Sequence, residues 1–170
     1  FTFMLGTGCR VGEVAGLRWQ DCDFQKNIIT IDHNLTYRPS EDGGGCTFRI
    51  STPKTKAGER IIPMFAAVRD ALISERIRQM ESGVNQSVVD GYSGFVFSNR
   101  FNEILNPHSI NRAIERIVRD YNLAESEQAE KESRKPELLP HFSAHNLRHT
   151  FCTRLCETGT NLKVIQEIMG

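Results

Sequence analysis

The sequence lacks a net charge, because its 170 residues carry 21 lysines and arginines against 21 aspartates and glutamates. This balance counts mildly against a nucleic-acid-binding protein, since most such proteins show a basic footprint. The sequence also lacks an apolar run as long as a membrane span, and no signal peptide opens it, so we expect no membrane partner. Without repeats or low-complexity tracts, the length fits one domain, residues 1–170, with a sizeable core.

A disulfide framework is missing as well. The five cysteines are odd in number and stand among apolar or helical neighbours, at Cys9, Cys22, Cys46, Cys152 and Cys156. This pattern favours reduced thiols in a cytoplasmic protein over the cross-links of a secreted one. The remaining composition, with 39% hydrophobic and 25% charged residues, is that of an ordinary soluble globular protein.

Charge is distributed unevenly along this neutral chain. Residues 120–137, DYNLAESEQAEKESRKPE, are mostly acidic and have little apolar content beyond their start, which predicts a solvated loop or a frayed helix. Elsewhere, basic side chains gather around an expected hairpin, at Arg38, Arg49, Lys54, Lys56 and Arg60. The charge in that region is therefore suited to an anionic ligand.

The hydrophobic pattern predicts an α+β fold that is mainly helical. Residues 27–32, 46–52 and 59–64 alternate with period two and are separated by turns, which predicts a small three-stranded antiparallel sheet. We expect helices over about 65–83, from Asn106 onwards, after Ser143, and from Asn161 to Gly170. The first helix is expected to bury Val68, Leu72, Ile73, Ile77 and Met80, and the second Ile110, Ile114, Ile117, Val118 and Tyr121.

Residues 141–156, HFSAHNLRHTFCTRLC, concentrate polar chemistry on one short helix. His145 and Arg148 are three residues apart and share one face, while Leu147, Phe151 and Leu155 form a second face that we expect against the core. A partly buried guanidinium needs an anionic partner, and its planar fork suits a phosphate. An adjacent histidine exchanges protons near neutral pH. Alternatively, Arg148 pairs with a carboxylate of its own domain.

The same stretch allows a zinc site as a second interpretation. Its potential ligands recur one helical turn apart, at His141, His145, His149, Cys152 and Cys156. Against this, Ser143 as N-cap leaves His141 outside the helix, and the remaining side chains spread around the helix axis. We therefore favour the phosphate over the metal.

Residues 7–24, TGCRVGEVAGLRWQDCDF, form a second polar motif. Gly6 and Gly8 free the backbone just before Arg10, and Glu13 follows one helical turn later. Glu13 either holds the Arg10 guanidinium in place or forms an ordinary surface pair with it.

These two motifs, in this order and spacing, resemble the catalytic domain of the tyrosine recombinase (phage integrase) family. The run PHFSAHNLRHTFCTRLCETGTNLKVIQEIMG is similar in particular to integrases of conjugative transposons. The resemblance covers nearly the whole chain. It implies an enzyme that cuts and rejoins double-stranded DNA through a 3′-phosphotyrosyl intermediate, for integration and excision of a mobile element. It also implies that this enzyme needs no cofactor or metal and acts together with other recombinase protomers. The expected location is the nucleoid in a bacterial cytoplasm.

The resemblance also implies a catalytic role for particular residues. Arg10 and Arg148 match the two arginines that hold the non-bridging oxygens of the scissile phosphate, and His145 matches the general acid/base of the H-x-x-R motif. A hairpin lysine that protonates the departing 5′ oxygen falls on Lys54 or Lys56. We favour Lys54, because the turn KAGE begins after it.

The chain departs from the family pattern at its ends. The family continues past the IMG position to a second histidine and the nucleophilic tyrosine, so we expect a domain that is incomplete at both ends and inactive alone. Tyr37, Tyr92 and Tyr121 do not stand in the nucleophile's sequence context.

Two alternatives remain: a relative that binds DNA or regulates without catalysis, and a type IB topoisomerase. The residues of both motifs resemble those of integrases, which argues against the topoisomerase.

Overall fold

A computed structural model describes residues 1–40, 42–53 and 58–170. The helices are α1 (Thr2–Thr7), α2 (Val11–Gly16), α3 (Ala66–Ser82), α4 (Pro107–Lys131), α5 (Ala144–Glu157) and α6 (Leu162–Met169), with a 3-10 turn at Trp19–Asp21. The strands are β1 (Cys22–Asp23), β2 (Ile28–Ile31), β3 (Asn34–Pro39), β4 (Cys46–Ser51) and β5 (Arg60–Pro63). The α+β expectation is confirmed, and no helix in these ranges is long and apolar enough to cross a membrane.

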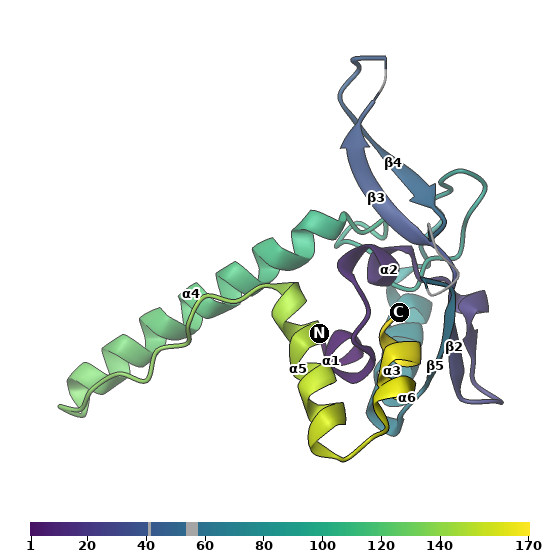
Figure 1. The fold of residues 1–170 in the computed structure, drawn as a ribbon. Coiled ribbons are helices and arrows are strands. Elements are labelled where there is room, and N and C mark those ends of the chain that lie inside the picture. The colour runs from purple at the N-terminus through teal and green to yellow at the C-terminus, as the bar shows by residue number, and fades with distance from the viewer. Residues whose placement is uncertain (41, 54–57) are drawn as a thin grey trace.

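The strands form two small antiparallel sheets instead of one. The three-stranded sheet has the order β1-β2-β5, and β4 pairs with β3 in a separate two-stranded sheet that projects from the body (Figure 1). The predicted three-stranded sheet therefore exists, but β1 takes the place that we expected for β4. Tyr37 lies directly opposite Phe48 in the β3–β4 pair, with ring centroids 4.7 Å apart. Such cross-strand aromatic pairs stabilise a sheet, and this one favours pairing with β3.

The main core contains buried residues of α1, α3, α4, α5 and the three-stranded sheet, and α1 packs against both α3 and α5 (Figure 1). On α5, Phe151 is buried and Leu147 and Leu155 are half-buried against the core, which confirms the predicted apolar face. On α3, Val68 and Leu72 are buried as expected. The expectation for the other members of its stripe was wrong, because Ile73, Ile77 and Met80 are exposed.

The buried face of α3 is continued by a polar residue instead. Gln79 is buried two helical turns after Leu72 on the same face of α3. Its amide donates to the Val96 carbonyl oxygen and accepts from the Trp19 indole N–H at 3.0 Å. Both hydrogen bonds offset the cost of burying the amide. From Ile73 onwards, the apolar pattern alone therefore pointed to the wrong side of the helix.

Helix α4 begins as predicted and ends later than expected. The Asn106 side chain accepts from the His108 backbone N–H at 2.9 Å, and Pro107 fills the first helical position. The helix continues to Lys131, so most of the acidic segment is helical and not a loop. Figure 1 shows α4 extending away from the body, with the following chain returning beside it.

Side chains tie the returning chain to this helix. Glu125 accepts from the Arg134 guanidinium, and Asn122 exchanges two hydrogen bonds with the backbone of Leu139, at 2.7 and 2.9 Å. These contacts order an acidic segment that its composition alone marked as solvated.

Candidate active site

Arg10 is held at the start of α2 by Glu13. The Arg10 backbone N–H donates to Glu13 Oε2 at 2.7 Å, and its guanidinium Nη1 donates to Oε1 at 2.9 Å. Glu13 is only 6% exposed, whereas half of the Arg10 side chain is exposed. Of the two interpretations left open by the sequence, the structure therefore supports Glu13 as a group that holds the guanidinium in place.

Glycines let α2 lie directly on the β3 backbone. A Cβ atom at Gly12 would stand 2.9 Å from the Leu35 carbonyl oxygen, and one at Gly16 would stand 2.9 Å from the Leu35 nitrogen. Both distances are shorter than a carbon atom tolerates against backbone. The close contact fixes where the first turn of α2, and with it Arg10, stands above the sheet.

A third glycine brings α5 to the same place. Gly8 has a φ of 63° at the end of α1, and a Cβ there would meet the Phe151 ring at 2.5 Å. The Gly8 carbonyl oxygen accepts from Arg148 Nη1 at 2.7 Å. Gly8 therefore joins the loop that leads to Arg10 with the helix that carries Arg148.

Arg148 is buried without a carboxylate partner in the described part of the chain. It is 8% exposed, and its guanidinium donates to the carbonyl oxygens of Gly8, Met169 and Gly170. Burial, followed by the nearby charge of Arg10, holds the pKa of Arg148 below its usual range. The alternative in which Arg148 pairs with a carboxylate of its own domain is therefore not what the described residues show.

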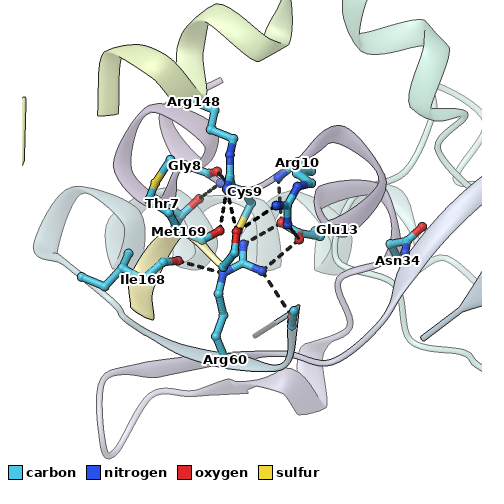
Figure 2. Close-up of polar contacts among 12 residues, drawn as sticks. Thr7, Gly8, Cys9, Arg10, Glu13, Asn34, Arg60, Arg148, Ile168 and Met169 are labelled. Atoms are coloured by element: carbon cyan, nitrogen blue, oxygen red, sulfur yellow. Dashed lines mark hydrogen bonds and ion pairs between the residues drawn. The ribbon is translucent and has the colours of Figure 1, made fainter. Parts of the chain in front are cut away.

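The guanidiniums of Arg10 and Arg148 meet at one acceptor atom. The Gly170 carbonyl oxygen lies 3.0 Å from Arg10 Nη2 and 3.5 Å from Arg148 Nη2. The same two residues and His145 line a cavity of about 270 Å³, closed by Cys9, Asn111 and Ser143. Figure 2 shows Arg10 and Arg148 on the two sides of Cys9. An oxygen placed here is within reach of both arginines.

His145 stands in the first turn of α5, exposed to solvent at the rim of this cavity. Its ring packs edge-to-face against that of His149, with centroids 4.3 Å apart. Among the residues that the structure describes, three potential metal-binding groups come together at Asp21, Asp32 and His33, and none do so on α5.

Hydrogen bonds engage the histidine of the Asp21–Asp32–His33 group. His33 Nδ1 lies 2.5 Å from a carboxylate oxygen of Asp32, and Nε2 lies 2.8 Å from the Gly16 carbonyl oxygen. Both ring nitrogens are therefore engaged, which leaves neither free as a metal ligand.

Both candidate hairpin lysines, Lys54 and Lys56, lie outside the described residues. The residues that flank this segment, Pro53 and Gly58, line a larger cavity of about 660 Å³. Arg10 lines the same cavity. The described residues on both sides of the two lysines therefore lie at the wall of a cavity that reaches the Arg10 side chain.

Sequence reasoning missed the role of Arg60. It grouped this residue with the basic side chains around the expected hairpin, but the side chain is 3% exposed and donates to both carboxylate oxygens of Glu13, at 2.7 and 2.9 Å. The period of two puts Arg60 and Ile62 on the same face of β5, and this was the one signal in the sequence. In the structure that face is the inner one, because Ile62 is fully buried while Ile61 is exposed. Period-two alternation alone did not tell which face was the inner one.

Charge in the site is strongly unbalanced. Among the described residues, three guanidiniums, those of Arg10, Arg60 and Arg148, stand around the one carboxylate of Glu13 (Figure 2). Burial raises the pKa of Glu13, but Arg60 and then Arg10 outweigh it and hold the pKa below its ordinary value, so the carboxylate is ionised. The remaining formal excess of two positive charges suits a doubly coordinated anion such as a phosphate.

The three tyrosines lie in different surroundings. The Tyr92 ring packs on His33 and beneath the Arg18 guanidinium, and Tyr121 is half-exposed on α4. Tyr37, on β3, lines the larger cavity that Arg10 also reaches.

Comparisons with known proteins cover the whole chain. The model of the Phage integrase family matches residues 1–170. The chain is 36% identical over 167 residues to the transposase from transposon Tn916 of Enterococcus faecalis, and equally to that from Tn1545 of Streptococcus pneumoniae. Each match covers 98% of this chain and 37% of the relative, so the chain spans less than half the length of these proteins.

Solved structures of integrases and recombinases have a similar fold. The Tn1549 transposon integrase in complex with transposon right end DNA superposes with a TM-score of 0.79 at 33% identity, over 98% of this chain and 48% of that one. The XerA recombinase superposes with a TM-score of 0.62 at 23% identity, over 98% of this chain and 46% of that one, which supports the fold alone.

Proposed function

Because the chain belongs to the phage integrase family, we propose that it is the catalytic part of a site-specific tyrosine recombinase acting on double-stranded DNA. The relatives are transposases of transposons, and one solved integrase is bound to transposon end DNA, which supports integration and excision of a mobile element as the biological reaction. Two observations carry the proposal: Arg10 and Arg148 meet at one oxygen, and both line a cavity together with His145.

The proposed chemistry is metal-free phosphoryl transfer. Arg10 and Arg148 hold the two non-bridging oxygens of the scissile phosphate and stabilise the charge that develops on the pentacovalent phosphorane. A tyrosine oxygen forms the new bond to phosphorus while the bond to the 5′ oxygen breaks, and His145 exchanges the proton as general acid/base. The 3′-phosphotyrosyl bond conserves the energy of the broken one, so rejoining requires no ATP.

Lys54 is the proposed donor of the proton to the departing 5′ oxygen. The support is the position of its neighbours: Pro53 and Gly58 line the cavity that reaches Arg10.

We also propose that none of Tyr37, Tyr92 and Tyr121 is the nucleophile, so that these 170 residues form no DNA adduct alone. Tyr92 is packed between His33 and Arg18, and Tyr121 stands on α4 among exposed residues. Tyr37 is the rival to test, because it lines a cavity with Arg10.

The test is a denaturing gel of protein with labelled duplex DNA that carries the cleavage site. The complete recombinase should form a covalent band without metal or ATP, and so should its Tyr37→Phe variant. Arg148→Ala should lower the rate of adduct formation about 10²–10³-fold, with DNA binding largely kept, because the lost charge acts mainly in the transition state. A covalent band from the 170-residue chain alone would contradict the assignment of the tyrosines, and no band from the complete protein would contradict the function.

A further inference from the structure

A buried ion pair behind the phosphate-binding arginines has no part in the reaction proposed above. We propose that Arg60 is a positioning residue for strand transfer. It fixes the orientation of the Arg10 guanidinium through the carboxylate of Glu13, which both arginines contact. The inference rests on the proposed function, because its effect appears as a rate of DNA cleavage. It rests on contacts among described residues that lie far apart in the sequence (Figure 2).

The donors of Arg60 are taken up by the protein. Nη1 and Nη2 donate to the two Glu13 carboxylate oxygens at 2.9 and 2.7 Å, and Nε donates to the Ile168 carbonyl oxygen at 2.8 Å. Nη1 also approaches the Gly58 carbonyl oxygen at 3.4 Å. With a side chain that is 3% exposed, Arg60 has no free face for a DNA phosphate. It therefore acts through other residues and not on the substrate.

Glu13 transmits this contact to Arg10. Each of its carboxylate oxygens accepts from both residues: Oε1 from the Nη1 atoms of Arg60 and Arg10, and Oε2 from Arg60 Nη2 and the Arg10 backbone N–H. The bidentate contact with Arg60 fixes the plane of the carboxylate. Because Arg10 is bound to that same plane, its guanidinium is left with a defined edge toward the cavity.

Arg60 also connects three elements that build the site. It is the first residue of β5, and it contacts Glu13 on α2 and Ile168 near the end of α6. The Gly170 oxygen at which Arg10 and Arg148 meet follows two residues after Ile168. One side chain thus fixes the relative positions of α2, β5 and the end of α6.

Losing this contact should slow the reaction more than it weakens DNA binding. In Arg60→Met the carboxylate keeps only Arg10 as a partner, so the Arg10 guanidinium follows it away from the phosphate. A displacement of 1 Å costs up to about 100-fold in rate, so we expect a fall of about 10- to 100-fold at saturating DNA. The DNA concentration for half-saturation should stay unchanged. The rate of Arg60→Lys should lie between those of the wild type and Arg60→Met, because an ammonium group cannot bind both carboxylate oxygens as the planar guanidinium does.

The experiment measures single-turnover adduct formation by the complete recombinase over a range of DNA concentrations. Arg18→Met is the matched control, because Arg18 forms a similar buried pair with Asp21, at 2.9 Å and with side chains 13% and 6% exposed. Its side chain contacts Asp21, the Gln20 amide and the Tyr92 ring, and none of these is placed in the proposed reaction. Both variants lose a buried ion pair, but only the Arg60 variant should lower the rate constant. Partial unfolding would instead lower the amplitude of the reaction.

A second comparison separates positioning from a purely structural role. If Arg60 acts through Arg10, then Arg60→Met should cost less than about threefold in an Arg10→Lys background, because the two changes remove the same interaction. Equal losses in both backgrounds would overturn the inference. If Arg60→Met does not fold, Arg60→Lys and Glu13→Gln are compared in the same two backgrounds, with the same expected result.

The outcomes distinguish this inference from the function on which it rests. An active wild-type protein whose Arg60 variants match the Arg18 control would overturn the positioning role and leave the recombinase function intact. A wild-type protein that forms no adduct would overturn the function, and the positioning role with it.

Discussion

A single carboxylate organises the site at the scale of residues. Glu13 accepts four hydrogen bonds, two from Arg10 and two from Arg60, and is nearly inaccessible to solvent. A buried charge is tolerated only when it is paired and hydrogen-bonded, and this one is paired twice. Its ionisation should therefore be visible in the stability of the fold.

The stability of the protein should depend on pH through Glu13. The contacts with Arg60 and Arg10 hold its pKa below the ordinary value of 4.5 against the opposing effect of burial. A carboxyl group with a lowered pKa stabilises the fold above its unfolded pKa, and this contribution is lost as the pH falls through the folded value. The free energy of unfolding should therefore fall below about pH 4.5, and less steeply in Glu13→Gln.

Urea unfolding at a series of pH values measures this dependence. At about pH 7, Glu13→Gln should be destabilised by about 3–5 kcal/mol, because it leaves the buried Arg60 guanidinium without its counter-charge. Glu115→Gln, at an exposed position of α4, is the control and should follow the wild type. Parallel pH profiles for Glu13→Gln and wild type would show that Glu13 carries no such linkage.

At the scale of elements, the contact between α2 and β3 carries the site. Gly12 and Gly16 stand on the face of α2 that touches the Leu35 backbone. We expect Gly16→Ala to destabilise the fold by about 1–3 kcal/mol, because the added methyl group forces α2 away from the strand. The same shift should displace Arg10 and slow adduct formation by the complete protein. Gly44→Ala is the control, because a methyl group there meets nothing within 4 Å.

Thermal unfolding and the adduct assay together decide this prediction. A Gly16→Ala protein that is as stable and as fast as Gly44→Ala would mean that α2 has room to move on β3 without disturbing Arg10.

Several elements could be predicted from the sequence because their signals are local. Asn106 and Asn161 cap the helices that they were expected to cap, each accepting a hydrogen bond from a backbone N–H two residues on. Pairing of the strands depends instead on contacts between distant residues, such as Tyr37 with Phe48. The local pattern carries no information on such a partner, and for this reason the place of β4 was predicted wrongly.

At the scale of the whole molecule, the site exists only through the tertiary fold. Arg10 and Arg148 come from opposite ends of the chain and are joined across the end of α1, which lies against α5 (Figure 1). Spacing along the sequence indicates only that each stands on a helix. Their convergence, and that of His145, was predicted from the resemblance of two motifs to a family. The link through Arg60 and Glu13 needed the structure, because neither motif contains Arg60.

The central claim is that Arg10 and Arg148 share one DNA phosphate. A crystal structure of the protein with duplex DNA that contains the cleavage site tests it most directly. We predict that two non-bridging oxygens of one phosphate lie about 3 Å from the guanidiniums of Arg10 and Arg148, with His145 beside them. DNA bound to another face, or a phosphate that contacts Arg10 while Arg148 remains on backbone carbonyl oxygens alone, would contradict the account.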